Sequence, residues 1–269
     1  GEMVPFRLLH LVGLVVCMVF ARSAAMAFNR IADRHIDAEN PRTSQRHLPS
    51  GQLSLNSVIL FTALTSLGFI GSTCFFLPNW LPMKLSGPVL VILFVYSLTK
   101  RFTFLAHFWL GLSLMLAPLA AWIAIRGDII LQNPADLAPP MVMGLSVLFW
   151  VAGFDILYAC QDFDFDKQAN LKSVPVRFGI LGALRIAAVS HAFMVLLLLL
   201  LPATSFLGGP DLELGLIYWV GIVALALLLL YEHSLVNPDN LDRVNMAFFN
   251  VNAVVSVGLF VVVTLDLLI

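Results

Sequence analysis

PFRLLHLVGLVVCMVFARSAAMAFNRIADRHID, residues 5–37, combines a long apolar segment with an abrupt polar end. Residues 5–28 are long enough to cross a bilayer as a helix, which takes about 20 predominantly apolar residues. The segment closes on Asn29, Asp33 and Asp37, each four residues after the last. On a helix this spacing places the three side chains on one face, a turn apart. We therefore predict a membrane helix that ends in a stripe of oxygen-bearing side chains.

A second acidic cluster repeats the arrangement later in the chain. FDILYACQDFDFD, residues 154–166, again closes an apolar segment. Its pair Asp162 and Asp166 has the same four-residue spacing as Asp33 and Asp37 and lies 129 residues after them. The chain is therefore expected to have two halves with equivalent polar ends.

Both helices are expected to continue beyond their apolar parts. Nothing breaks the first before Asn40, which precedes Pro41 and is thereby disfavoured from the α region. The second is the helix that ends its apolar part near Tyr158. If it also continues, one face of it carries three carboxylates while the fourth points nearly opposite. The three are Asp155, Asp162 and Asp166, and the fourth is Asp164.

Composition indicates a membrane protein with many spans. The chain has 269 residues, of which 60% are hydrophobic and 12% charged, and its mean hydropathy is +0.93. A formal net charge of -1 gives no basic surface for nucleic acid. Only helices satisfy their backbone groups within single spans in lipid, so we predict an all-α, multi-span helical bundle. Eight spans are expected, at about 5–28, 55–77, 81–99, 104–126, 139–160, 181–207, 212–232 and 245–269.

The basic residues divide the connecting segments into two sets. One side has only Arg7, Lys84 and Arg126, whereas the other has most of the Lys and Arg residues and both acidic clusters. By the positive-inside rule, we expect the acidic side to face the cytoplasm. The segments on that side are 29–54, 100–103, 161–180 and 232–244.

The acidic stripes favour a metal site. Two unit charges about 4 Å apart repel by roughly 4 kcal/mol at an effective dielectric near 20, so paired carboxylates need a proton, a basic partner or a metal. Oxygen ligands without nearby Cys or His at metal spacing favour Mg²⁺, which leaves positions for phosphate oxygens. The predicted metal-binding residues are Asn29, Asp33, Asp37, Asp162 and Asp166.

Basic residues beside the stripes complete a diphosphate site in this interpretation, because Lys and Arg pair with phosphate oxygens. The candidates are Arg42, Arg46, Lys100 and Lys172, with Arg101 next to them. Two simpler interpretations stay open: the carboxylates form surface ion pairs, such as Asp33 with Arg30, and the cations only anchor the topology. His107 and His191 are expected to be interfacial.

These residues resemble the UbiA superfamily of intramembrane aromatic prenyltransferases. The first signature is Asn29-x3-Asp33-x3-Asp37 followed by RTSQRHLPSG at 42–51, and the second is Asp162-x3-Asp166 preceded by Asp155. The resemblance extends through YSLTKRFT at 96–103 and covers most of the chain, as a single domain over 1–269.

The resemblance implies Mg²⁺-dependent transfer of a polyprenyl group from polyprenyl diphosphate to an aromatic acceptor, most closely 4-hydroxybenzoate, for quinone synthesis in a bacterial inner membrane. Asp155 is the carboxylate expected at the phenol hydroxyl. The family has nine helices around a central cavity, so with eight predicted spans the first is expected to be missing here. Arg30 stands where many members have Asp, which argues against a metal role at that position.

Other functions remain open at this point. Within the same enzyme class, the acceptor can be a naphthoate for menaquinone synthesis, homogentisate, haem or a lipid phosphate. In another class, a cation-coupled transporter also uses acidic residues at helix ends. A structural subunit is a third possibility.

Overall fold

The computed structural model describes residues 4–236 and 250–268, and every regular element in these ranges is helical. The long helices are α1 (Leu8–Glu39), α2 (Leu55–Ser72), α3 (Leu81–Thr99), α4 (Ala106–Gln132), α5 (Ala138–Ala159), α7 (Val174–Leu200), α8 (Leu216–Leu235) and α10 (Asn252–Leu268). A short helix, α6 (Phe163–Gln168), and four 3₁₀ turns, Thr73–Phe76, Pro134–Leu137, Cys160–Asp162 and Leu201–Leu207, lie between them.

The predicted spans correspond to these helices. Seven are long and apolar enough to cross a membrane, and α10 is an eighth apolar helix of 17 residues. The first part of the predicted span 245–269 lies outside the described residues. The all-α, multi-span prediction is therefore confirmed.

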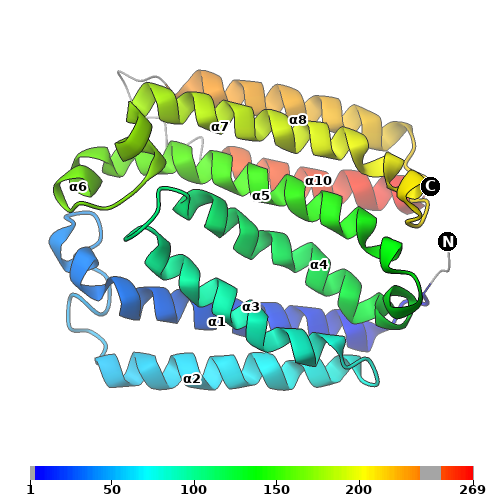
Figure 1. Ribbon diagram of the computed structural model, residues 1–269, viewed down its shortest axis with the longest axis horizontal. Coiled ribbons are helices and arrows are strands. Elements are labelled where there is room, and N and C mark those ends of the chain that lie inside the picture. The colour runs from blue at the N-terminus through cyan, green and yellow to red at the C-terminus, as the bar shows by residue number, and fades with distance from the viewer. Residues whose placement is uncertain (1–3, 237–249, 269) are drawn as a thin grey trace.

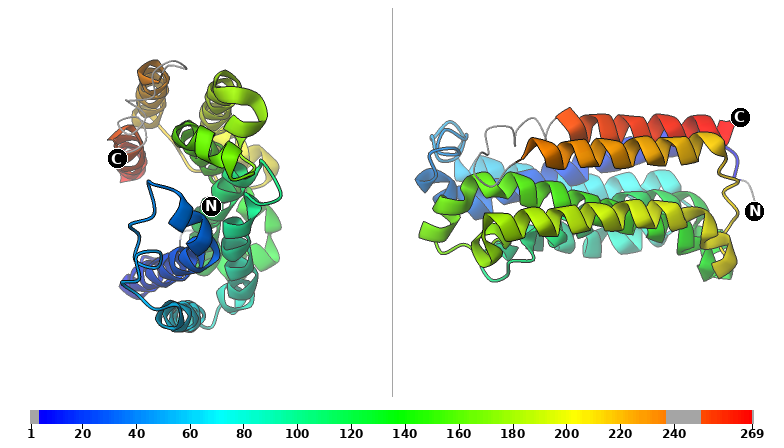
Figure 2. Two further views of the ribbon diagram at one scale, coloured as in Figure 1. Left: turned by 90° about the vertical axis from the view of Figure 1, so that its left-hand side faces the viewer. Right: turned by 90° about the horizontal axis from the view of Figure 1, so that it is seen from above.

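The helices run back and forth along one axis, which brings distant segments of the chain together at one end. Figure 1 shows the loop after α1, the link between α3 and α4, and α6 gathered at the left-hand end, while both chain ends lie at the right. Seen end-on, the helices follow an arc from α1 and α2, through α3 and α4, to α5 and α7, with α8 and α10 beyond them (Figure 2). Both predicted acidic motifs lie at the left-hand end.

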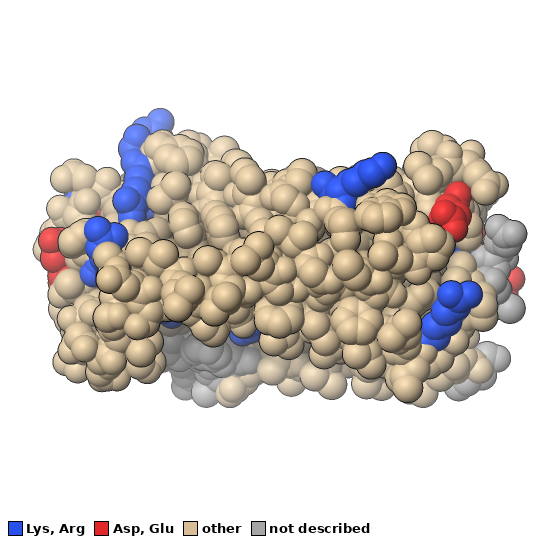
Figure 3. Space-filling model, turned by 90° about the horizontal axis from the view of Figure 1, so that it is seen from below, with Lys and Arg blue, Asp and Glu red and all other residues tan. Residues whose placement is uncertain are grey.

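Much of the lateral surface is apolar. Large hydrophobic side chains stand exposed along the helices, for example Leu64 on α2, Val91 on α3 and Leu227 on α8. Figure 3 shows one such face, on which charged residues are few and lie mainly toward the two ends. An apolar lateral surface of this kind suits contact with lipid.

Small residues let the central helices approach closely. A Cβ atom at Gly111 on α4 would overlap the backbone carbonyl of Leu148 on α5, and one at Gly153 on α5 would overlap the His191 ring on α7. Helix pairs in membranes commonly use glycine in this way, because packing drives their association. The α4–α5–α7 layer is therefore closely packed, and α5 within it leads into the second acidic motif.

The helices α8 and α10 are joined at the end away from the acidic motifs. Asp266 on α10 accepts hydrogen bonds from the backbone N–H groups of Gly215 and Tyr218, at 2.7 and 3.0 Å. These are donors of the first turn of α8, which have no partner within their own helix. The Tyr218 hydroxyl in turn donates to the carbonyl of Leu198 on α7, at 2.6 Å. A carboxylate from α10 thus caps α8, which is itself bonded to α7.

Gly111→Ala is expected to loosen the α4–α5 contact. Because the added methyl meets a backbone carbonyl that cannot rotate away, the overlap should lower Tm by about 2–10 °C, as overpacking in a tight core does. The matched control is Gly71→Ala on α2, where a Cβ meets nothing within 4 Å. Thermal unfolding in lipid nanodiscs measures both, and equal Tm values for the two variants would contradict the prediction.

Candidate active site

The C-terminal end of α1 presents the first motif. The helix continues to Glu39, as predicted, so Asn29, Asp33 and Asp37 lie on successive turns of one face. Although they are charged, Asp33 and Asp37 are only 3% and 4% exposed. The loop that follows folds back over the helix end, where the Thr43 hydroxyl donates to the carbonyl of Asp37 at 3.1 Å. The first motif is therefore enclosed by its own loop.

Asp33 is contacted by two cations that directly follow α3 and by Asn29 on its own helix. Its Oδ2 accepts from Lys100 Nζ at 2.7 Å and from Asn29 Nδ2 at 3.1 Å. The same Asn29 amide lies 3.3 Å from the hydroxyl of Ser97. Arg101 Nη2 lies 3.5 Å from Asp33 Oδ1, beyond a strong hydrogen bond. Asn29 thus orients the first carboxylate, and two cations lie beside it.

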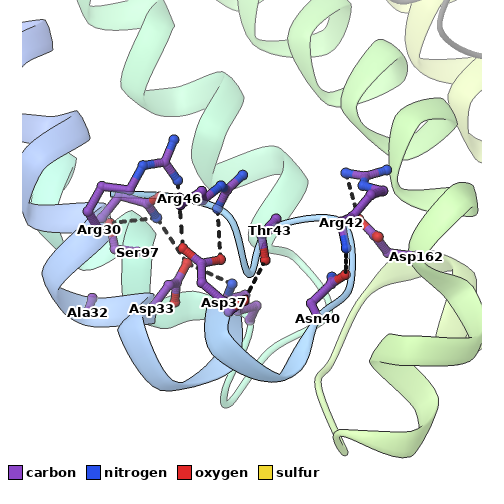
Figure 4. A network of polar contacts seen from close by, with 12 residues as sticks. Arg30, Ala32, Asp33, Asp37, Asn40, Arg42, Thr43, Arg46, Ser97 and Asp162 are labelled. Carbon is purple, nitrogen blue, oxygen red and sulfur yellow. Dashed lines mark hydrogen bonds and ion pairs between the residues drawn. The ribbon is translucent and has the colours of Figure 1, made fainter. Parts of the chain in front are cut away.

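Asp37 is held by its own loop. Arg46 Nη1 donates to its Oδ1 at 2.7 Å, whereas Arg30 Nη1 lies 3.8 Å from its Oδ2 (Figure 4). One oxygen of each carboxylate, Asp33 Oδ1 and Asp37 Oδ2, is buried without a hydrogen-bond partner. An unsatisfied buried polar atom is costly, most of all on a charged group. These two oxygens are the positions at which the first motif can accept a cationic ligand.

Arg42 connects the first motif to the second. Its Nη2 lies 3.1 Å from Asp162 Oδ2, and its Nη1 donates to Gln161 Oε1 at 3.3 Å (Figure 4). The guanidinium also lies over the ring of Tyr158, 4.8 Å from its centre, in cation–π geometry. The two acidic motifs therefore meet through the loop that follows α1.

The second motif does not continue its helix as predicted. α5 ends at Ala159, and the 3₁₀ turn Cys160–Asp162 redirects the chain into α6. The expectation of one helical face with Asp155, Asp162 and Asp166 was therefore wrong, because a tighter turn changes the phase. Asp162 and Asp166 are nonetheless partly buried, whereas Asp164 is exposed, as its opposite direction had suggested.

Asp155 has a partner that the sequence did not reveal. Its Oδ2 lies 2.7 Å from His107 Nδ1, on α4. His107 and His191, predicted to be interfacial, are both enclosed by protein, at 5% and 2% exposure. His191 lies against the carbonyl of Trp150 and the His233 ring, at 3.2 and 3.0 Å. The sequence signal for these contacts was a histidine within an apolar span. Burying a polar side chain there costs free energy unless it finds a hydrogen-bond partner.

Of the predicted diphosphate cations, three contact carboxylates: Lys100, Arg46 and Arg42. Lys172 instead donates through its exposed Nζ to the carbonyl of Phe102, at 3.3 Å. Its backbone N–H donates to the carbonyl of Lys100, at 2.7 Å. Lys172 therefore joins the segment before α7 to the end of α3, beside the site.

Charge and ligand chemistry at this end fit a cation with phosphate. Five cationic side chains lie within 4 Å of three carboxylates, so cations outnumber carboxylates among these ion pairs. The sequence suggested an ion pair between Asp33 and Arg30. In the structure Asp33 pairs with Lys100, and Arg30 lies beside Asp37. Among residues 4–236 and 250–268, no three His, Cys, Asp or Glu side chains form a metal cluster. Mg²⁺ needs no such cage, because one or two carboxylates plus substrate phosphates and water hold it.

Comparison with known proteins agrees with this architecture. Residues 2–254 match the UbiA prenyltransferase family. The 4-hydroxybenzoate octaprenyltransferase of Vibrio atlanticus (strain LGP32) is 31% identical over 258 residues, which cover 93% of this chain and 84% of that protein. The protein of the same description from Marinobacter nauticus is 30% identical over 244 residues, covering 90% and 77%.

Solved structures have the same fold. The apo structure of a UbiA homolog from Aeropyrum pernix K1 is 31% identical, with a TM-score of 0.84, over 98% of this chain and 91% of that one. A UbiA homolog from Archaeoglobus fulgidus bound to DMAPP and Mg²⁺ is 22% identical, with a TM-score of 0.69, over 96% and 88%. The second supports the fold alone. With both signature motifs at one end of a membrane helix bundle, and with the family match over residues 2–254, this chain belongs to the UbiA prenyltransferase family and is a prenyltransferase.

Proposed function

We propose that this protein transfers a polyprenyl group from polyprenyl diphosphate to an aromatic acceptor, 4-hydroxybenzoate, in quinone biosynthesis. The observation that carries the proposal is the pair of buried carboxylates, Asp33 and Asp37, each with one unpartnered oxygen and each beside two cations. A diphosphate and its counter-ion require both features in one place. The names of the curated relatives support the acceptor.

The proposed roles follow the contacts. Asp33 and Asp37 offer unpartnered oxygens to a metal, Asn29 orients Asp33, and the second motif supplies carboxylates from the facing side. The metal-binding set is Asn29, Asp33, Asp37, Asp162 and Asp166. The diphosphate-binding set is Arg42, Arg46, Lys100 and Lys172. Asp155 acts on the acceptor.

Charge stabilisation carries most of the chemistry. When bound, Mg²⁺ supplies positive charge to the departing diphosphate. Lys100, Arg42 and Arg46 come from two separate loops, so together they orient the diphosphate and stabilise the negative charge that grows as the allylic C–O bond breaks. Asp155 accepts a hydrogen bond from the phenol hydroxyl, which increases electron density on the ring carbon that attacks. The polyprenyl tail remains among apolar side chains or lipid.

The reaction is proposed to take place at the cytoplasmic surface of a bacterial inner membrane. The positive-inside rule supports this orientation, because the end with both motifs carries most of the Lys and Arg residues. Polyprenyl diphosphate then enters from the bilayer, and the water-soluble acceptor enters from the cytoplasm.

A transfer assay tests the proposal directly. The full chain in lipid nanodiscs is incubated with polyprenyl diphosphate and Mg²⁺, together with 4-hydroxybenzoate or a dihydroxynaphthoate, and products are identified by mass spectrometry. We expect a prenylated hydroxybenzoate. Prenylation of the naphthoate alone would replace the acceptor with that of menaquinone synthesis. No prenylated product, with ion-coupled uptake in proteoliposomes, would overturn the proposal in favour of a transporter.

A further inference from the structure

His107 contacts two elements of the site at once. Its Nδ1 lies 2.7 Å from Asp155 Oδ2 on α5, and its Nε2 accepts a hydrogen bond from the backbone N–H of Val174, the first residue of α7, at 3.3 Å. The ring is 5% exposed, so the protein supplies nearly all of its surroundings. Both ring nitrogens are therefore engaged by protein groups.

These contacts fix the tautomer of His107. A backbone N–H only donates, so Nε2 must present its lone pair to Val174. The single proton of the neutral ring then lies on Nδ1, where it donates to Asp155 Oδ2. With Oδ2 turned toward His107 in this way, Oδ1 is the oxygen of Asp155 that makes no contact with the ring.

The hydrogen bond between His107 and Val174 links Asp155 to the segment that carries the second acidic motif. First-turn N–H groups of a helix have no partner within the helix, and the N-cap residue Ser173 makes no side-chain cap on α7. His107 supplies the missing acceptor at this position. Since α7 begins directly after the segment that carries Asp162 and Asp166, one imidazole connects that segment to Asp155.

We propose that His107 is the positioning residue that holds Asp155 with Oδ1 directed to the phenol hydroxyl of the aromatic acceptor. The inference rests on the proposed function, which it deepens by naming how the acceptor is oriented. Because both of its nitrogens bond to protein groups, His107 has no nitrogen left for a hydrogen bond to substrate and acts through Asp155. It should therefore affect the acceptor and leave the diphosphate site unchanged.

Two substitutions separate this role from a merely structural one. His107→Asn keeps a donor near the place of Nδ1 and loses the acceptor for Val174, whereas His107→Gln keeps an acceptor near Nε2 and loses the donor to Asp155. We expect His107→Gln to raise the acceptor KM by about tenfold or more, as expected for one lost hydrogen bond to a charged group. The KM for polyprenyl diphosphate should not change. His107→Asn should retain the acceptor KM at a lower Tm.

The opposite order, with the acceptor KM raised in His107→Asn and normal in His107→Gln, would overturn the proposal. A double-mutant cycle adds a second criterion: in an Asp155→Asn background, His107→Gln should have no further effect on acceptor KM, and additive effects would overturn the positioning role. Failure of the proposed function can be told apart from failure of the positioning role. In the first case the wild-type chain itself prenylates no aromatic acceptor. Thermal unfolding in nanodiscs identifies a variant that does not fold, and the other variant and the cycle then decide the outcome.

Discussion

Asp33→Asn is expected to lower the rate of prenyl transfer by about 100- to 1,000-fold, the usual effect of removing one preorganised electrostatic group from an active site. Asparagine has nearly the same shape, so it still accepts from Lys100. The variant lacks the negative charge and one of the two carboxylate oxygens. In the wild-type protein, Oδ2 accepts from Lys100 and Oδ1 is buried without a hydrogen-bond partner. Initial rates in nanodiscs at saturating Mg²⁺, with product measured by chromatography, provide the test.

The matched control for this variant is Asp164→Asn. Asp164 belongs to the second acidic motif but is exposed. Substitutions of exposed residues usually change the stability of a protein little, so we expect the rate of prenyl transfer to change by no more than about twofold. A rate unchanged in Asp33→Asn would remove this residue from the metal and diphosphate site. A large loss in Asp164→Asn would show that exposure is a poor guide to which carboxylates of that motif act.

Removal of Mg²⁺ should abolish transfer, and Asp37→Asn should raise the Mg²⁺ concentration required for half-maximal rate by roughly 10- to 100-fold, the range seen when groups supporting a metal site are changed. The reason is again an unpartnered buried oxygen, Asp37 Oδ2, whose neighbour Arg30 lies 3.8 Å away. Chelation followed by Mg²⁺ titration measures the shift. Electron paramagnetic resonance of Mn²⁺ with polyprenyl diphosphate measures binding without turnover.

Glu39→Gln is the control for the metal titration, since Glu39 is an exposed carboxylate at the end of the same helix. It should leave the Mg²⁺ requirement unchanged. If Asp37→Asn and Glu39→Gln respond alike, the effect arises from the general charge of this surface, and Asp37 is no specific ligand. Full activity after chelation would exclude the metal requirement itself.

Local signals in the sequence were sufficient for the first half of the site. The apolar length of residues 5–28 predicted a span, and Asn40–Pro41 predicted where the helix stops, so the phase of Asn29, Asp33 and Asp37 followed. Each of these depends on neighbours along the chain. Steric restriction before proline and helical periodicity act within a few residues.

The second half depended on contacts that no local pattern contains. No proline or glycine marks the turn at Cys160–Asp162, so the continuous helix predicted through Asp166 was wrong. Ion-pair partners could not be chosen either, because several cations lie near each carboxylate in sequence and only the packed bundle selects Lys100 for Asp33. The bond from His107 to Asp155 likewise needs the α4–α5 packing, because the two residues are 48 positions apart in the sequence.

The contacts of Arg42 also determine when the site can form during synthesis. Arg42 and Gln161 are 119 residues apart, so at a translation rate of about 5–20 residues per second the first motif is made roughly 6–24 s before its partner. By about the midpoint of that interval the growing chain contains both Arg46 and Lys100, the cations that neutralise Asp37 and Asp33, but nothing yet for Arg42 to hold. The first motif is thus kept charge-balanced by early-made residues, and the completed site is a late product of membrane insertion.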